Sequence, residues 1–89
     1  MPRVHFTSNI QRHVECPTTE ANGESLQIVL DSVFALIPRV KEYVLDDQGH
    51  LRKHMVIFID GNKLKDGSNF DIPVNPESEI YIMQALSGG

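Results

Sequence analysis

The residues of this chain that could do chemistry stand at its C-terminus, which reads Ser87-Gly88-Gly89. Glycine has no Cβ atom, so a Gly-Gly tail is thin enough to thread a narrow channel in another protein. We expect the carboxylate of Gly89 to be free, and such a tail could then bring it to a partner's active site. The alternative interpretation is a frayed chain end, which most domains have.

Internal side chains are weaker candidates. Cys16 is the only cysteine, which excludes an intramolecular disulfide and a cysteine zinc site. It has no base or cation beside it in sequence, so we expect a partly buried structural thiol. His5 and His13 are expected on outward faces of neighbouring strands, where they could approach each other, but without a third ligand we predict no metal site. Asp46-Asp47 is typical of a solvated turn.

Size and charge narrow the classes of function. A chain of 89 residues forms one domain with one modest core, which counts against a self-contained enzyme. The net charge of −4, without a strong basic cluster, predicts no nucleic-acid binding and suits a basic partner surface. No apolar stretch approaches ~18 residues and no signal peptide is evident, so we expect no membrane association and a cytoplasmic location.

Hydrophobic alternation predicts a β-hairpin at the N-terminus. Residues 3–8 alternate with Val4 and Phe6 on one face, and residues 11–16 alternate with Val14 and Cys16 inward. A turn at residues 8–9 would join the two strands.

One amphipathic helix follows. Ser25 is the expected N-cap, and Pro38 is expected to stop the helix or begin a short turn. The apolar stripe has helical spacing and would face a core: Leu26, Val29, Leu30, Val33, Phe34 and Ile37.

The second half of the chain predicts further strands. Residues 54–60 are strongly β-prone and end at an Asp60-Gly61 turn, and residues 79–86 form a last strand. The segment between them, broken by Gly67 and two prolines, has room for one short strand. The order β-β-α-β-(β)-β predicts an α+β fold with one helix across one face of a mixed sheet.

The two long strands each have two apolar faces. One set is assigned to the helix-facing core: Met55, Ile57, Ile59, Ile80 and Ile82. The other set would form an apolar patch near the base of the tail, where we expect a partner to bind: Val56, Phe58, Tyr81 and Met83, with Leu86 beyond them. The alternative is that a loop or the short strand covers this face.

These features resemble a known family. The β-β-α-β-β order, the stretch HMVIFIDG and the ending EIYIMQALSGG are similar to the MoaD/ThiS-type sulfur carriers, over nearly the whole chain. That group includes the small subunit of molybdopterin synthase and carriers for thiamine thiazole, cysteine synthesis and tRNA thiolation. The resemblance implies a ubiquitin-like β-grasp domain over residues 1–86, with a four- to five-stranded mixed sheet and one main helix, and a flexible tail over residues 87–89.

The resemblance also implies a chemistry. A partner enzyme of the ubiquitin-activating type would use ATP to adenylate the Gly89 carboxylate. A persulfide or other sulfur donor would displace AMP, and the resulting thiocarboxylate would pass its sulfur to an acceptor enzyme. Gly88 and Gly89 match the family motif, and Met83 falls where some relatives place an apolar partner contact. The chain would bind no cofactor, because ATP belongs to the partner, and it would be a carrier (or a synthase's small subunit) instead of an enzyme.

The sequence departs from the family pattern in two places. Residues 76–79 read Pro-Glu-Ser-Glu where relatives often carry Asp-Gly-Asp-Glu, and residues 84–86 read Gln-Ala-Leu where some molybdopterin relatives have Pro-Pro-Val. The second departure weighs against the molybdopterin branch. Two other functions stay open: a ubiquitin-like modifier joined to lysines through Gly89, and a plain interaction module in which Gly-Gly is incidental.

Overall fold

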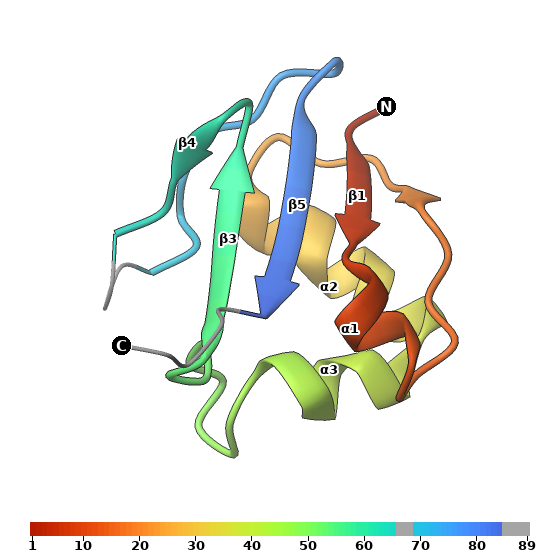
Figure 1. Ribbon diagram of the computed structural model, residues 1–89. Helices are drawn as coiled ribbons and strands as arrows, with labels where there is room; N and C mark the ends of the chain where they lie inside the picture. Colours follow the sequence, from red (N-terminus) through yellow and green to blue (C-terminus); the bar gives the residue numbers. More distant parts are fainter. Residues whose placement is uncertain (66–68, 85–89) are drawn as a thin grey trace.

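A computed structural model of the protein describes residues 1–65 and 69–84. Figure 1 shows a single sheet with helices behind and below it. The sheet contains β1 (Arg3–Phe6), β2 (Thr19–Glu20), β3 (Met55–Ile59), β4 (Asn62–Lys63) and β5 (Glu79–Gln84), in the order β2-β1-β5-β3-β4. The helices are α1 (Ser8–Gln11), α2 (Leu26–Leu36) and α3 (Pro38–Val44).

The last strand lies in the middle of the sheet. β5 pairs in parallel with β1, and the other neighbouring strands are antiparallel. The helix α2 packs behind this mixed sheet, whereas no described element lies in front of β3 and β5 (Figure 1). The predicted α+β, ubiquitin-like β-grasp fold is therefore confirmed.

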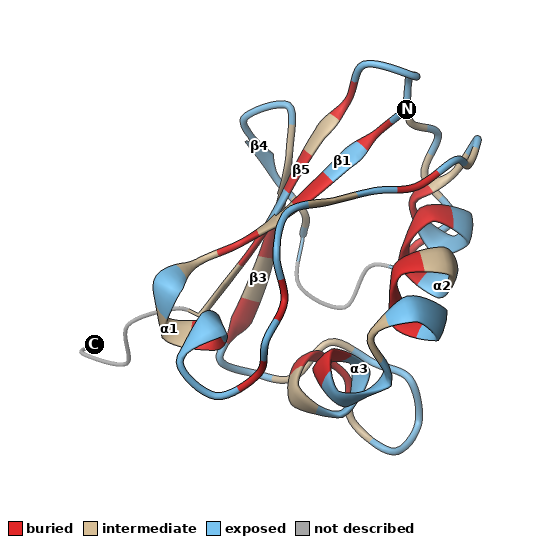
Figure 2. Cartoon of the chain, turned by 90° about the vertical axis from the view of Figure 1, so that its right-hand side faces the viewer, coloured by how far each residue is buried: buried red, intermediate tan, exposed pale blue. Residues whose placement is uncertain are grey.

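The main helix begins and buries its stripe as predicted. The backbone N–H of Ile28 donates to Oγ of Ser25 at 3.3 Å, so Ser25 is the N-cap of α2. Leu26, Val29, Leu30, Val33 and Phe34 are buried, and Figure 2 shows the buried side of α2 facing the sheet.

A second helix follows where the sequence predicted a stop or a short turn. Ile37 has φ −130° and ψ 75°, because the residue before a proline is biased away from the helical region. Pro38 then occupies the first turn of α3, a position where its missing N–H costs no hydrogen bond. Val40 and Val44 are buried, so α3 also contributes to the core. No described helix is long and apolar enough to cross a membrane.

The predicted N-terminal hairpin is wrong in its second strand. Residues 8–11 form α1, and the partner of β1 is β2, with Val4 opposite Thr19. Ile10 and Val14 are four residues apart and both buried, and the N–H of Val14 donates to the carbonyl of Ile10. Helical spacing was therefore mistaken for strand alternation. Val14 and Cys16 do point inward as predicted.

Hydrogen bonds of the Asp60 carboxylate, which we call the polar latch, hold the start of β5 beside the end of β3. Asp60 (φ 50°) and Gly61 (φ 87°) form the predicted turn, now seen to lead into β4. One carboxylate oxygen of Asp60 accepts from Oγ of Ser78 at 3.0 Å, and the other accepts from the N–H of Glu79 at 2.9 Å. This latch supports the register that decides which face of β5 is buried.

Candidate functional site

The expected reacting residues Gly88 and Gly89 lie outside the described residues, as do Leu86 and the expected tail of residues 87–89. The structure describes the surface from which that tail leaves, up to Gln84 at the end of β5.

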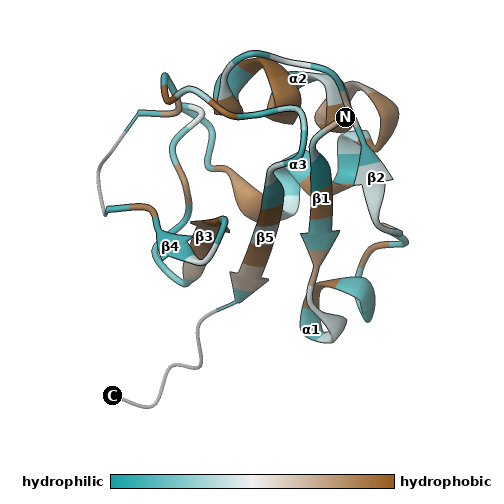
Figure 3. Ribbon diagram, turned by 90° about the horizontal axis from the view of Figure 1, so that it is seen from above, coloured by the Kyte–Doolittle hydropathy of each residue, from teal (hydrophilic) through white to brown (hydrophobic). Residues whose placement is uncertain are grey.

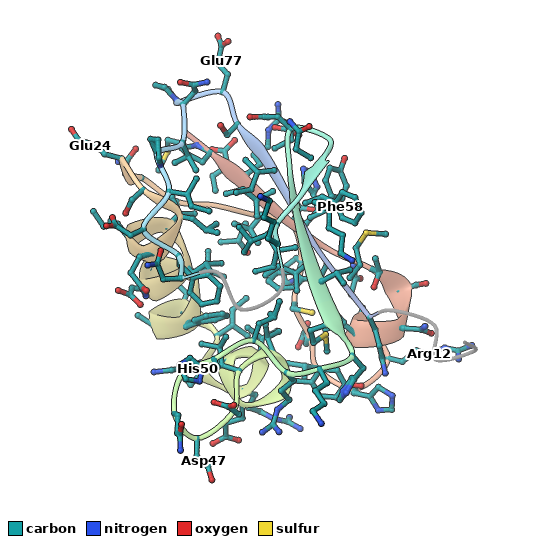
Figure 4. The ribbon with its side chains drawn as sticks, turned by 90° about the vertical axis from the view of Figure 1, so that its left-hand side faces the viewer. Arg12, Glu24, Asp47, His50, Phe58 and Glu77 are labelled. Carbon is teal, nitrogen blue, oxygen red and sulfur yellow. The ribbon has the colours of Figure 1, made fainter. Side chains whose placement is uncertain are left out.

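Four apolar side chains form an open-face patch on the side of the sheet away from α2. Val56 of β3 lies opposite Met83 of β5, and Phe58 lies opposite Tyr81. Tyr81 is 42% exposed, and the other three are half-buried. Phe58 points away from the helices in Figure 4, and Figure 3 shows β3 and β5 as markedly apolar strands.

The intervening residues of both strands face the core. Met55, Ile57, Ile80 and Ile82 are buried, and Ile59 is partly buried against the same cluster. The assignment of faces from alternation is confirmed. Partner binding by the open-face patch stays a prediction.

Side chains of β1 and its surroundings hold Tyr81 in place. The ring of His5 stacks on that of Tyr81, with centroids 4.4 Å apart and planes 16° apart. Nε2 of His5 lies 2.9 Å from one carboxylate oxygen of Glu79, and its Nδ1 lies 3.3 Å from Oγ1 of Thr18. Arg3 Nε lies 3.3 Å from the other Glu79 oxygen. A pre-positioned aromatic ring loses less freedom on binding, which favours affinity.

The stacking of His5 on Tyr81 has no signal in the sequence. The alternation of β1 correctly placed His5 outward, but the stacking depends on the parallel pairing of His5 with Tyr81. That pairing joins residues far apart in sequence, and no local pattern indicated it.

The base of the tail is held by α3 and β3. Gln84 lies opposite Met55 in the β3–β5 register. The hydroxyl of Tyr43 on α3 donates to Oε1 of Gln84 at 3.5 Å, and His13 stacks on Tyr43 with centroids 5.4 Å apart. These contacts surround Gln84, the last described residue of β5.

The expected placement of His5 and His13 on neighbouring strands is wrong for His13, which lies in no strand. His5 stacks on Tyr81 of β5, whereas His13 follows α1 and stacks on Tyr43 of α3. The cause is the misassigned second strand, which turns into a helix before it reaches His13. Within residues 1–65 and 69–84, no three His, Cys, Asp or Glu side chains are grouped to hold a metal ion.

Cys16 is a free thiol that is more completely buried than expected. Its Sγ donates to the carbonyl of Val14 at 3.2 Å. Burial raises the pKa of the Cys16 thiol, because it disfavours the thiolate. A raised pKa argues against a nucleophile at neutral pH.

Asp46 forms the expected turn. Its Oδ1 accepts from the backbone N–H groups of His50 and Gln48, both at 2.9 Å. The hydrogen bond from His50 is the main cause that lowers the pKa of this carboxyl, and Gln48 adds to it. The Asp46 side chain stabilises its own loop through these hydrogen bonds. This structural role explains the lowered pKa, so no catalytic role is needed to explain it.

Comparison with known proteins places this fold among ubiquitin-like proteins. No family model matches the sequence, and no curated protein matches it. Solved structures do match. A chain of the BexX/CysO complex of Amycolatopsis orientalis has a TM-score of 0.81 at 16% identity, with 100% of both chains covered. SAMP1, the small archaeal modifier protein 1 of Methanosarcina acetivorans, has a TM-score of 0.77 at 23% identity, covering 99% of this chain and 95% of that one.

A third match is Urm1 of Trypanosoma brucei, with a TM-score of 0.71 at 14% identity, covering 99% of this chain and 94% of that one. At these identities the likeness shows a shared β-grasp fold. The matched proteins are of the MoaD/ThiS type of ubiquitin-like carriers and modifiers, the group that the sequence resembles.

Proposed function

We propose that this protein is a sulfur carrier whose working group is the C-terminal carboxylate of Gly89. The observation that carries the proposal is the placement of the open-face patch on β3 and β5, where β5 is the strand that continues toward Gly-Gly. One strand thus joins an apolar surface suited to a partner with the chain end suited to chemistry. The shared fold with carriers and modifiers gives further support.

The chemistry proceeds in two stages on a partner of the ubiquitin-activating type. The Gly89 carboxylate attacks the α-phosphorus of ATP and pyrophosphate leaves, which gives a mixed anhydride with AMP. A carboxylate is a poor electrophile, and the anhydride supplies the missing leaving group. The terminal sulfur of a persulfide then attacks the acyl carbon and AMP leaves. A thiol reduces the resulting acyl disulfide and releases the thiocarboxylate.

This chain supplies recognition and the acyl group. The partner would bind the open-face patch, with Tyr81 as the pre-positioned aromatic anchor, and would draw the tail into its own site. The thiocarboxylate would then pass its sulfur to an acceptor enzyme of a biosynthetic pathway in the cytoplasm, where ATP is available. The protein would be a substrate of this system instead of an enzyme.

The complex with BexX supports the idea that a protein of this fold works with partner proteins. A second candidate, a modifier joined to lysines through Gly89, is supported by the name of the archaeal match, small archaeal modifier protein 1. Both functions require the same adenylate. A search for lysine-linked conjugates after activation separates them.

The test is the intact mass of the protein after incubation with the activating enzyme, ATP and a persulfide donor. We expect exchange of one oxygen for sulfur in the wild type. We expect no exchange after deletion of Gly89 or addition of one residue after it. An untrimmed, extended protein that gains the sulfur would contradict the proposal.

A further inference from the structure

Positive charge is concentrated where β5 ends. Two segments flank this point: residues 8–13, which contain α1, and residues 52–54, which lead into β3. They contain no Asp or Glu. They carry five residues that we call the basic collar: Arg12, His13, Arg52, Lys53 and His54. The chain as a whole has a net charge of −4, so the positive charge of these two segments is opposite in sign to the net charge.

The collar flanks the base of the tail from two sides. Lys53 and His54 directly precede Met55, which lies opposite Gln84. On the other side, α1 contacts β5, and Arg12 is the C-cap residue of α1. Figure 4 shows Arg12 at the same end of the molecule as the start of β3.

Most of the collar is free to meet a partner. Arg12, His13, Lys53 and His54 are exposed, and Arg52 is half-buried with its Nε donating to the carbonyl of Glu42. No salt bridge within residues 1–65 and 69–84 involves a collar residue.

The rest of the surface is mainly acidic. Where β5 begins, Asp60, Glu77 and Glu79 lie close together in the chain fold, and Glu77 projects at the far end from Arg12 (Figure 4). At the collar's own end, Arg52 lines a hollow with Glu42, Asp46 and Asp47, and Asp47 projects from the corner away from Arg12 (Figure 4). The positive surface is therefore local, and Arg12 and Lys53 near the end of β5 are its main charges.

We propose that the basic collar docks against an acidic protein surface that rims the channel receiving the tail. This inference rests on the proposed function and names the partner surface. In this arrangement the collar would contact the mouth of the channel.

The charge distribution determines both the direction of approach and the class of partner. An acidic rim attracts the collar and repels the opposite end, so the molecule arrives with its tail leading. A nucleic acid fits less well, because its phosphates would extend beyond the collar toward Glu15, Glu42 and Asp47. Net charge alone suggested a basic partner surface, and the local distribution reverses that expectation for the tail end.

The collar is tested first without any activating enzyme. A hexaglutamate peptide is titrated into the labelled protein, and backbone amide shifts are recorded at low and high salt. We expect shifts centred on Arg12, Lys53 and His54 that vanish at about 0.5 M salt. Shifts of equal size around Arg39 or Lys65, or none at all, overturn the proposal. The proposal is also overturned if a single-stranded oligonucleotide binds the collar more tightly than the hexaglutamate peptide does.

The second arm measures the rate of association with the activating enzyme. The variant R12E/K53E is compared with R39E/K65E, which makes the same charge changes at exposed sites outside the collar. We expect R12E/K53E to associate about tenfold more slowly at low salt, with the difference shrinking to about twofold at 0.5 M. The control pair should stay within about twofold of wild type. Equal losses in both pairs overturn the proposal.

Two further controls keep the outcomes distinct. Circular dichroism checks the fold of every variant, and R12Q/K53Q should show a smaller loss than the charge reversal. A wild type that gains no sulfur contradicts the proposed function, and the peptide titration then decides the collar alone. If R12E/K53E gains sulfur as fast as the wild type, the docking role of the collar is contradicted and the proposed function is not.

Discussion

The two faces of the β3–β5 pair are both apolar, but they differ in what covers them. On the inner face, Ile57, Ile80 and Ile82 are completely buried in the core that α2 and α3 complete. On the outer face, Tyr81 keeps 42% of its surface exposed. Residues of the same chemical type therefore stabilise the fold on one face and stay available on the other.

This difference shows how one strand can serve two purposes. Burial of apolar area contributes about 25 cal/mol per Å² to folding stability. Most of this contribution from β3 and β5 comes from the inner face, because the outer face is only partly buried. An apolar surface left in water marks a binding site more often than a stability element. Because β5 also leads to the tail, the proposed recognition surface and the proposed chemistry would share a single strand.

The largest expected effect comes from placing a charge on the inner face. Ile82→Asp puts an unpaired carboxylate in the core, which should cost roughly 4 kcal/mol or more. A small domain has only about 5–15 kcal/mol of stability, so we expect a largely unfolded protein at moderate urea concentrations. Urea denaturation followed by circular dichroism measures this. A loss under about 1 kcal/mol would mean that the inner face is assigned wrongly.

The neighbouring residue on the outer face supplies the matched comparison. Met83→Asp should leave the free energy of unfolding within about 1 kcal/mol of wild type. It should weaken binding to the activating enzyme by about 2 kcal/mol, or roughly thirtyfold, if Met83 contributes a central contact. Calorimetric binding and urea denaturation on the same sample measure both quantities. Lost stability with retained affinity would contradict the account of the two faces.

The smallest effect concerns a buried thiol outside the two strands, at the edge of the same core cluster. Because burial raises the pKa of the Cys16 thiol, the folded protein has less thiolate than the unfolded chain at mildly alkaline pH. The associated stability is fully present below the unfolded pKa and is lost as pH rises through the folded pKa. Iodoacetamide at pH 8 should alkylate the folded protein at least about tenfold more slowly than the urea-unfolded chain. Equal rates would show that Cys16 is accessible.

Much of the fold was predictable because its signals are local. The Ser25 cap, the α2 stripe and the Asp60-Gly61 turn each depend on residues close together in sequence. The two faces of β3 and β5 followed from strict alternation and long apolar runs. These features were confirmed where they fall within the described residues.

The failures had physical causes of two kinds. Residues 10–16 contain both a four-residue and a two-residue apolar spacing, so residues 11–16 were assigned to a strand, whereas the structure has α1 over Ser8–Gln11 and no strand over residues 12–16. Contacts across the sheet, such as His5 on Tyr81, require a parallel pairing that leaves no local signal. The position of the collar beside Gln84 was missed for the same reason, since its two segments are separated by the whole helical half of the chain.

The central claim is tested most directly by locating the transferred sulfur. Wild-type protein is incubated with activating enzyme, ATP and persulfide donor, then cleaved and sequenced by tandem mass spectrometry. The account predicts that one oxygen is replaced by sulfur in the C-terminal peptide, with the change confined to Gly89. Sulfur bound to Cys16, or a C-terminal peptide that never changes mass while the activating enzyme modifies a control carrier, would contradict it.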